Sequence, residues 1–208
     1  IYVVGLARSV RGLRLPAPRR CRGETGNGVW AVSMVRNEQD VVEGTIQHLL
    51  SQDVDRVIVV DNGSTDSTPR ILRRLAAQDE RLVVGVDREP AYYQSQKMTL
   101  LALHATRAGA RWIVPFDADE WWFAEEGTIG RFLATCGANV VEARLHNAFP
   151  TLGETVRLEV QPHEMRKVAY RANPLAVLAM GNHWVSRSGP WGGGLRIAHF
   201  PWRSQDQL

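Results

Sequence analysis

The sequence is poor in cysteine. Its two cysteines, Cys21 and Cys136, lie far apart and form no CxxC or Cys/His pattern. Disulfide-held secreted domains and structural zinc sites need more cysteines at closer spacing, so both classes are excluded. Reduced thiols are typical of intracellular proteins, and we therefore expect a cytoplasmic protein.

Long hydrophobic runs are also missing. No stretch reaches the roughly 18 to 20 uninterrupted apolar residues of a membrane span, and no signal peptide is recognisable. The chain has 208 residues, 44% of them hydrophobic, and seven tryptophans. This length and composition predict one folded domain with a core of its own.

Lysine is scarce among the basic residues. Of 25 basic residues only Lys97 and Lys167 are lysines, which we interpret as codon bias. The charge is uneven, because residues 1–28 carry six arginines against one glutamate (+5), which leaves −2 for the rest of the net +3. This basic extension has one aromatic residue, Tyr2, and no amphipathic periodicity. We expect a solvated or edge-packing segment without a nucleic-acid partner, and peripheral contact with an anionic membrane is the alternative.

From residue 29 the pattern alternates between short β-branched runs and helical periods. Such alternation predicts βαβ units around a mainly parallel sheet, with helices on both faces. The expected strands are 29–35, 56–60, 81–86 and 111–116. The expected helices begin near Val42, at Thr68, which would cap a helix with Pro69 at its first position, and at residue 94; the last ends at Gly109.

The chain after residue 126 is less regular. Thr128 is expected to cap a short helix through Thr135, and 140–145 to form a strand. Residues 155–160 and 167–172 are expected as two further strands, and "PWGGGL" at 190–195 as a flexible connection. We therefore divide the domain into a regular half at 29–125 and a less regular half at 126–208.

Three polar clusters follow expected strands: "RNE" (Arg36, Asn37, Glu38), "DNGSTD" (61–66) and "DADE" (117–120). In an open α/β sheet, ligands bind beyond the carboxyl ends of parallel strands, so these clusters are expected to share one edge. Asp117 and Asp119 are two residues apart, and neighbouring carboxylates repel unless a cation or proton lies between them. Oxygen ligands of this kind suit Mg²⁺ or Mn²⁺. Arg36 and Lys97 are candidate partners for phosphate.

The order of these motifs resembles the GT-A glycosyltransferases, and within them the family 2 type. The likeness is carried by "VSMVRNEQDVVEGTIQHLL", "VDRVIVVDNGSTDSTPRIL" and "FDADEW", and then by "GNHWV" and "IAHFPWRS", over residues 29–204. The resemblance implies a three-layer α/β/α GT-A fold with a mainly parallel central sheet. It also implies transfer of a sugar from a nucleotide-diphosphate donor to an acceptor hydroxyl, usually with inversion. Residues 29–125 would then be the nucleotide-sugar-binding half and residues 126–208 the acceptor-side half.

The resemblance also implies roles for individual residues. Asp61 would bind the base or ribose, beside the backbone near Arg36. Asp119 would bind Mn²⁺ or Mg²⁺ directly, Asp117 would bind the ribose or a metal-bound water, and His199 would be a late metal ligand. Glu120 and His183 are the candidates for the base that takes the acceptor proton.

Two departures from the family pattern stand out. Many members have a second aspartate where this chain has Asn62, and the QxxRW element of processive synthases is absent, which favours single transfers. A non-catalytic sugar-nucleotide or carbohydrate-binding module and a sugar nucleotidyltransferase are the alternatives. The latter needs a Gly-rich loop with Arg after the first strand, where "VRNEQD" stands. A dinucleotide dehydrogenase would need GxGxxG there. An aspartyl phosphatase would carry DxD on its earliest strand.

Overall fold

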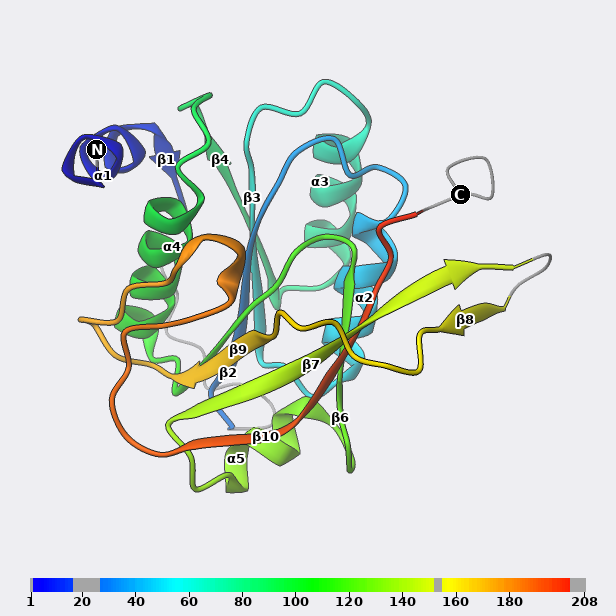
Figure 1. Cartoon of the computed structure of the whole chain (residues 1–208). Helices are drawn as coiled ribbons and strands as arrows, with labels where there is room; N and C mark the ends of the chain where they lie inside the picture. Colours follow the sequence, from blue (N-terminus) through cyan, green and yellow to red (C-terminus); the bar gives the residue numbers. More distant parts are fainter. Residues whose placement is uncertain (1, 17–26, 152–154, 203–208) are drawn as a thin grey trace.

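One mixed sheet runs through the protein, and helices cover both of its faces (Figure 1). The computed structural model describes residues 2–16, 27–151 and 155–202. The strands are β1 (Leu13–Arg14), β2 (Val29–Val35), β3 (Arg56–Asp61), β4 (Leu82–Asp87), β5 (Trp112–Pro115), β6 (Glu120–Ala124), β7 (Val140–Pro150), β8 (Val156–Leu158), β9 (Lys167–Arg171) and β10 (Trp191–His199). The helices are α1 (Tyr2–Gly12), α2 (Val42–Ser51), α3 (Thr68–Gln78), α4 (Gln94–Ala108), α5 (Ile129–Thr135) and the 3₁₀ turn η1 (Met180–Asn182).

The first half of the sheet is parallel, as the βαβ pattern predicts. The strand order is β1-β4-β3-β2-β5-β9-β7-β10-β6, with β8 paired to β7, and the strands β4, β3, β2 and β5 run parallel. The second half mixes directions, because β9 is antiparallel to both β5 and β7, and β10 lies parallel to β7 but antiparallel to β6. The predicted α/β class with a mainly parallel central sheet is confirmed.

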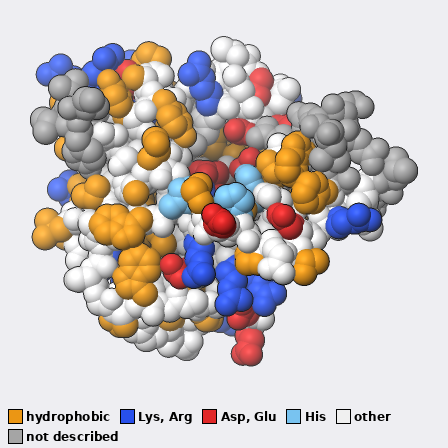
Figure 2. Space-filling model, in the orientation of Figure 1, with side chains coloured by type: hydrophobic (Ala, Val, Ile, Leu, Met, Phe, Trp, Pro, Cys, Tyr) orange, Lys and Arg blue, Asp and Glu red, His pale blue; other side chains and the backbone are white. Residues whose placement is uncertain are grey.

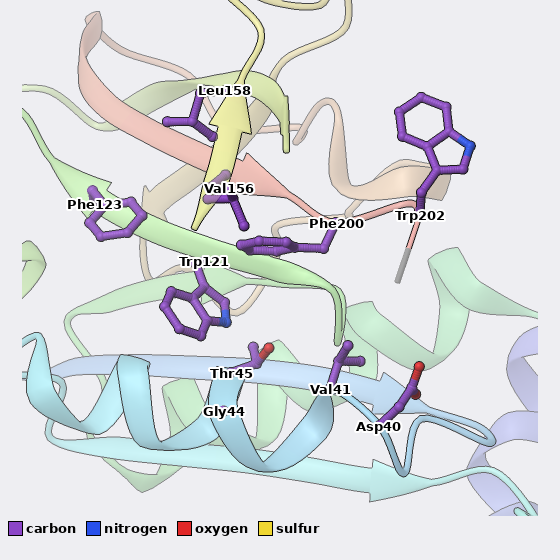
Figure 3. Close-up of a pocket in the computed structure, with 11 residues that line it drawn as sticks. Asp40, Val41, Gly44, Thr45, Trp121, Phe123, Val156, Leu158, Phe200 and Trp202 are labelled. Atoms are coloured by element: carbon purple, nitrogen blue, oxygen red, sulfur yellow. The ribbon is translucent and has the colours of Figure 1, made fainter. Parts of the chain in front are cut away.

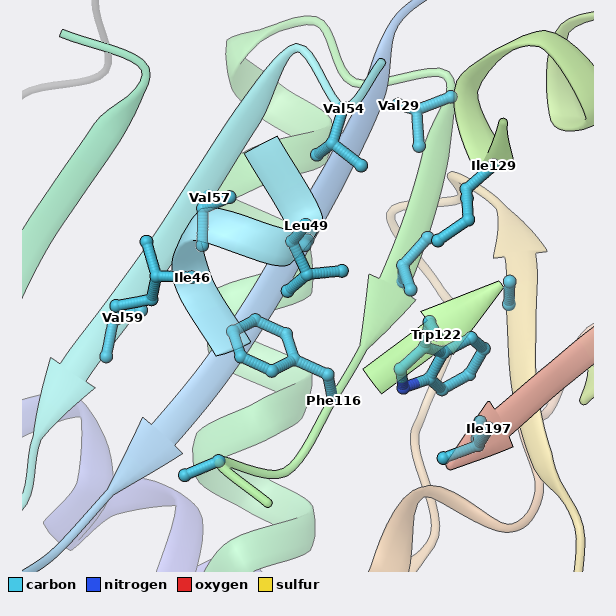
Figure 4. Packing of buried hydrophobic residues seen from close by; sticks show 14 of the residues in the cluster. Val29, Ile46, Leu49, Val54, Val57, Val59, Phe116, Trp122, Ile129 and Ile197 are labelled. Carbon is cyan, nitrogen blue, oxygen red and sulfur yellow. The ribbon is translucent and has the colours of Figure 1, made fainter. Parts of the chain in front are cut away.

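Alternate residues of the central strands enter two separate cores, one on each face of the sheet. Val57 and Val59 of β3 pack toward α2 and α3, whereas Ile58 and Val60 pack toward α4. Figure 4 shows Ile46 and Leu49 of α2 directed at the first of these layers. A strand buried on both faces has no polar side, which is why residues 56–60 read as a continuous apolar run.

The amino-terminal segment packs on the edge of the sheet, which is one of the two arrangements expected for it, but the prediction that it lacks periodicity is wrong. Residues 2–12 form α1, and β1 pairs antiparallel with the edge strand β4. The buried positions of α1 include Gly5, Ser9 and Gly12, which follow helical spacing but are small rather than hydrophobic. A Cβ atom on Gly5 would lie 2.9 Å from Tyr93, so the helix packs by close approach. The arginines at 19, 20 and 22, and Cys21, lie outside the described residues.

Three local predictions need correction. The "GGG" of residues 192–194 is not a flexible connection but part of β10, where the register with β7 shifts between Gly192 and Leu195. Glycines do not end the strand, because the hydrogen bonds between β10 and β7 join backbone groups and need no side chain. Residues 120–124 form a strand, β6, that the sequence did not indicate. Ser67, not Thr68, is the N-cap of α3, and the Thr68 hydroxyl accepts a hydrogen bond from the Glu38 N–H (2.8 Å).

Candidate active site

The carboxyl ends of β2, β3 and β5 lie at one edge of the sheet, where the strand order changes direction. β3 and β4 follow on one side of β2, and β5 lies on its other side. Such a switch point leaves a crevice between the loops that leave adjacent strands. The loops after β2 and β5 carry Arg36 and Glu38, and Asp117 and Asp119. Acidic and histidine side chains gather at a hollowed part of the surface in Figure 2.

A polar pocket of about 370 Å³ occupies this crevice. The predicted site residues in its wall are Arg36, Glu38, Asp117, Asp119 and His199. The rest of the wall is formed by Met34, Val35, Asn62, Pro90, Tyr92, Gln94 and Ala118. Arg36 is exposed, so its guanidinium is accessible to an anionic ligand in the pocket.

Asn37 and Asp61 do not line this pocket, and their contacts are local. The Asn37 side-chain oxygen accepts a hydrogen bond from the Thr65 N–H (2.8 Å), and its own N–H donates to the Ser64 hydroxyl (2.9 Å). Asn37 has a φ of 57°, a left-handed conformation that asparagine tolerates better than most residues. Asp61 is 7% exposed and accepts from the Ser64 N–H (3.3 Å). In this structure Asn37 ties the loop after β2 to the loop after β3, and Asp61 bonds within the loop after β3.

Asn62, the departure from the family's aspartate pair, has a structural explanation. Its side-chain amide donates to the Asp87 carboxylate (2.8 Å) and to the Glu89 carbonyl (2.9 Å), and the residue is 4% exposed. An aspartate at this position has no donor for either group and would place a second buried charge against Asp87. The amide is therefore required by the neighbouring strand β4.

Asn62→Asp is expected to destabilise the protein by about 3 kcal/mol, because two buried hydrogen bonds are replaced by like-charge repulsion. Urea unfolding followed by circular dichroism measures this loss. Asn173→Asp is the matched control, because the Asn173 side chain only accepts, from the Leu175 N–H, and an aspartate also accepts. Equal stability of the two variants would contradict the explanation.

The prediction that Lys97 binds phosphate is wrong. Its side chain is fully buried, and its ammonium group pairs with Asp87 (2.6 Å). The same nitrogen donates to the carbonyls of Glu89 (2.8 Å) and Ala91 (2.7 Å). All three N–H donors are used, so none is left for a ligand. Lys97 instead stabilises the loop between β4 and α4, which brings Pro90 and Tyr92 to the pocket wall.

The first carboxylate of the acidic motif is held on both of its oxygen atoms. Lys167 of β9 donates to Asp117 Oδ2 (2.5 Å), and Asn182 of η1 donates to Asp117 Oδ1 (3.2 Å). The Lys167 ammonium also lies 2.8 Å from Glu120 Oε1. Burial lowers the pKa of Lys167, but the charges of Glu120 and Asp117 outweigh it and hold the pKa above its ordinary value. Lys167 is therefore a fixed positive charge beneath the motif.

Glu120 is a poor candidate for the base that takes an acceptor proton. It is 1% exposed, and Lys167 pairs with one oxygen while the other accepts from the Asp117 N–H (3.1 Å) and the Trp122 indole (3.3 Å). Burial and the nearby charge of Asp117 raise its pKa above the ordinary value. A base must reach the hydroxyl it deprotonates, and this carboxylate is turned inward. The sequence-based assignment of Glu120 is corrected on this ground.

Asp119 and His199 face each other at the pocket rim, with 3.6 Å between Asp119 Oδ2 and His199 Nε2. The other imidazole nitrogen, Nδ1, lies 3.0 Å from the side-chain oxygen of Asn147, whose amide nitrogen donates to Glu159 (3.0 Å). This chain of contacts assigns the His199 proton to Nδ1 and leaves a lone pair on Nε2. Two lone-pair acceptors this close need a cation between them or a proton on Nε2.

This pair fits a Mg²⁺ or Mn²⁺ ion that completes its coordination with substrate phosphates. Such ions are commonly bound through one or two protein groups and keep other positions for phosphate oxygens and water. Within residues 2–16, 27–151 and 155–202, no group of three or more His, Cys, Asp or Glu side chains is placed to hold a metal ion. Asp117, predicted as a further metal group, is held by Lys167 and Asn182 instead.

A second pocket of about 330 Å³ adjoins the first and shares Asp117 and His199 with it. Its wall is otherwise formed by Glu120, Leu145, Asn147, His163, Met165, Lys167, His183, Pro201 and Trp202. His183 Nδ1 lies 2.8 Å from the Arg166 carbonyl, so Nδ1 donates and Nε2 keeps its lone pair. The end of the "IAHFPWRS" motif, at 203–204, lies outside the described residues.

Another pocket, of about 540 Å³, lies elsewhere and is mainly apolar. Trp121, Phe123 and Phe200 point into it from β6 and the segment after β10, opposite Val41 of the turn before α2 (Figure 3). It contains Asp40 but neither of the motif aspartates. Trp122, by contrast, is fully buried in the core.

The sequence analysis did not identify Lys167 and Asn182 as residues of the site, although the scarcity of lysine drew attention to Lys167. The chain has only two lysines, and both side chains are buried against aspartates, at 0% and 5% exposure. The codon-bias interpretation does not explain this placement. No sequence signal separates Asn182 from an ordinary turn asparagine.

Comparison with known proteins agrees with the fold and with the family that the sequence resembles. Residues 31–168 match the model of glycosyl transferase family 2, which is more than half of the chain. The protein therefore belongs to glycosyl transferase family 2. No curated protein sequence shows significant similarity to the chain.

Several solved structures are similar to the chain. S. aureus TarS 1-349 has a TM-score of 0.51 at 14% identity, over 69% of this chain and 47% of that one. The mannosyltransferase PcManGT from Pyrobaculum calidifontis, in complex with GDP-Man and Mn²⁺, has a TM-score of 0.45 at 24% identity, over 68% and 42%. Glucosyl-3-phosphoglycerate synthase from Mycobacterium tuberculosis has a TM-score of 0.40 at 24% identity, over 59% and 44%. The chain thus spans less than half the length of these proteins, and the TarS similarity supports the GT-A fold.

No helix in the described part of the chain has both the length and the apolar character needed to cross a membrane.

Proposed function

We propose that the protein transfers a sugar from a nucleotide-diphosphate donor to an acceptor hydroxyl, in single, inverting transfers that depend on Mn²⁺ or Mg²⁺. Family membership supports glycosyl transfer. The observation that carries the proposal is that the two polar pockets meet at Asp117 and His199. A donor in the first pocket and an acceptor in the second would place the anomeric carbon at their junction.

The donor pocket is assigned from its position and charge. It lies at the switch point of the parallel strands, and all of its wall except His199 comes from residues 29–125. Arg36 offers a positive charge to the diphosphate, and Asp117 offers oxygen acceptors to a sugar or ribose hydroxyl. A bound Mn²⁺ or Mg²⁺ would neutralise charge that develops on the diphosphate as it leaves.

The acceptor pocket is formed mostly by residues of the 126–208 half. In the reaction the acceptor oxygen forms a bond to the anomeric carbon while the bond to the diphosphate oxygen breaks on the opposite face. The acceptor proton passes to a base, and we assign this role to Nε2 of His183. Its Nδ1 bond to Arg166 fixes the neutral tautomer that has a lone pair for that proton.

Calorimetric titration of UDP, GDP and dTDP with and without Mn²⁺ tests the proposed function. We expect one nucleotide to bind at least about tenfold more tightly with Mn²⁺, since Asp119 and His199 would hold the ion and its charge would attract the diphosphate. Metal-independent binding of free sugars would indicate a carbohydrate-binding module. Absence of nucleotide binding under both conditions would overturn the proposal.

His183→Asn is expected to lower kcat about 10²- to 10⁴-fold and leave nucleotide affinity nearly unchanged, because the variant removes only the proton acceptor. Radiolabelled sugar transfer at saturating donor measures kcat. His146→Asn is the matched control, since His146 Nδ1 also faces a backbone carbonyl (Glu159, 3.0 Å) but lines neither polar pocket. A similar kcat for the two variants would exclude His183 as the base.

A further inference from the structure

The acidic motif encloses an internal positive charge that the proposed reaction does not explain. Lys167 enters from β9, the strand between β5 and β7, and its side chain is 5% exposed. Its ammonium contacts Asp117 and Glu120 at 2.5 and 2.8 Å. A buried lysine is costly unless it is paired, so this geometry is maintained by both carboxylates together.

Asn182 approaches the same carboxylate from the other side. It has a φ of 60° and is fully buried, a backbone conformation that costs on the order of 1 kcal/mol for a residue other than glycine. Its amide nitrogen donates to Asp117 Oδ1 at 3.2 Å. The side-chain oxygen Oδ1 of Asn182 has no partner among the described residues. Asn182 thus combines an unfavourable backbone conformation with an incompletely bonded side chain, and the side-chain hydrogen bond that it forms is to Asp117.

We propose that Lys167 and Asn182 are positioning residues that hold the Asp117 carboxylate away from the cation and leave Asp119 and His199 as the cation's protein ligands. The inference rests on the proposed function, because it concerns the ion that accompanies the donor.

The physical reason is competition between charges. A divalent ion is attracted to the position with the most carboxylate charge around it. Asp117, Asp119 and Glu120 lie within four residues, and without Lys167 the ion would be drawn toward Asp117 as a further ligand. With Lys167 in place, the positive charge near Asp117 is already supplied. The ion then stays at the pocket rim, and Asp117 keeps an orientation suited to a donor hydroxyl.

This arrangement predicts a specific dependence between two substitutions. In the wild-type background, Asp117→Ala is expected to change Mn²⁺ affinity by less than about threefold, because Asp117 is not a ligand. In a Lys167→Met background, Asp117 is released to the ion, and Mn²⁺ is expected to bind about tenfold more tightly. Adding Asp117→Ala to Lys167→Met then removes that gain.

The experiment measures binding of Mn²⁺ alone by electron paramagnetic resonance, and of UDP and GDP by calorimetry, for the four proteins of this cycle. Because Lys167→Met leaves Glu120 buried without its partner, a second cycle uses Lys167→Met with Glu120→Gln, which removes both charges and keeps the side-chain volumes. Arg81→Met is the control, since it removes a partly buried cation from an aspartate, Asp79, that lines neither polar pocket. Its Mn²⁺ affinity is expected to equal that of the wild type.

Kinetics provide a second readout. Asn182→Ala is expected to raise the donor KM about tenfold with a smaller change in kcat, because Asp117 then loses its orientation toward the donor. General damage to the fold would lower Mn²⁺ affinity in every Lys167 variant, whereas the proposal requires an increase.

The outcomes separate this inference from the proposed function. If the wild type binds no nucleotide diphosphate, the proposed function is wrong and the inference falls with it. If nucleotide and Mn²⁺ bind and Asp119→Ala abolishes Mn²⁺ binding, the function stands. In that case, an equal effect of Asp117→Ala in both Lys167 backgrounds would overturn the positioning role alone.

Discussion

Asp119→Ala is expected to lower kcat/KM for sugar transfer by a factor on the order of 10³, since a catalytic metal supplies several kcal/mol of charge stabilisation and each 1.36 kcal/mol is tenfold. The same substitution is expected to remove the Mn²⁺ dependence of nucleotide binding. Asp119 lies at the pocket rim, 3.6 Å from His199, so its loss takes away one of the two groups that face each other there. Transfer assays and calorimetry on one preparation measure both effects.

The effect on stability should be small, and this separates function from folding. Asp119 is only partly buried, and substitutions at such positions usually change stability little. Glu125→Ala is a suitable control, because Glu125 directly follows β6, the short strand that Asp119 directly precedes, and forms an exposed ion pair with Arg196 (3.2 Å). A wild-type rate in Asp119→Ala would show that the acidic motif does not act through a metal ion.

Lys97→Met is expected to cause the largest loss of stability, about 3 to 5 kcal/mol, because it leaves Asp87 charged and buried without its cation. For a protein of this size the loss corresponds to a fall in Tm of roughly 10 °C. The two carbonyls that accept from Lys97 also lose their donor, and the loop between β4 and α4 loosens with them. Differential scanning calorimetry and urea unfolding measure the change.

Two further variants make this prediction specific. Lys97→Met combined with Asp87→Asn removes both charges and should recover part of the stability. Arg74→Met breaks an ion pair with Glu43 in which both side chains are about 40% exposed, and should cost less than about 1 kcal/mol. If Lys97→Met costs no more than Arg74→Met, the buried pair does not stabilise the loop as argued.

The elements with a hydrophobic signal could be predicted from the sequence. Residues 56–60 are apolar on both faces because two layers of helices cover β3, and α5 begins where Thr128 caps it, its hydroxyl accepting from the Arg131 N–H. Helix α1 could not be predicted in the same way. Among its residues 5–12, the buried positions are glycine and serine, which carry no apolar signal. Strand β6 could not be predicted, because it begins inside the acidic motif, at Glu120, and continues with the two tryptophans.

The residues of the site likewise divide into those that the sequence could indicate and those that it could not. The sequence could indicate Asp117 and Asp119, because both follow a strand whose direction the βαβ pattern predicts, and it indicated His199 through the family resemblance of its motif. It could not distinguish Lys97 from Lys167. Both are lysines in a chain whose other basic residues are arginines. Lys97 is buried against Asp87, away from the acidic motif, whereas Lys167 lies beneath that motif.

By itself, the sequence determined the class of fold, the order of the parallel strands' motifs and the edge of the sheet at which they meet, because these depend on hydrophobic periodicity and on residues close together in the chain. Only the tertiary structure decided which partner each charged group has. Lys167 meets Asp117 across 50 residues of chain, and Asn182 meets it across 65. A charge pair of this kind depends on the distance between atoms in the folded protein, and no local pattern encodes that distance.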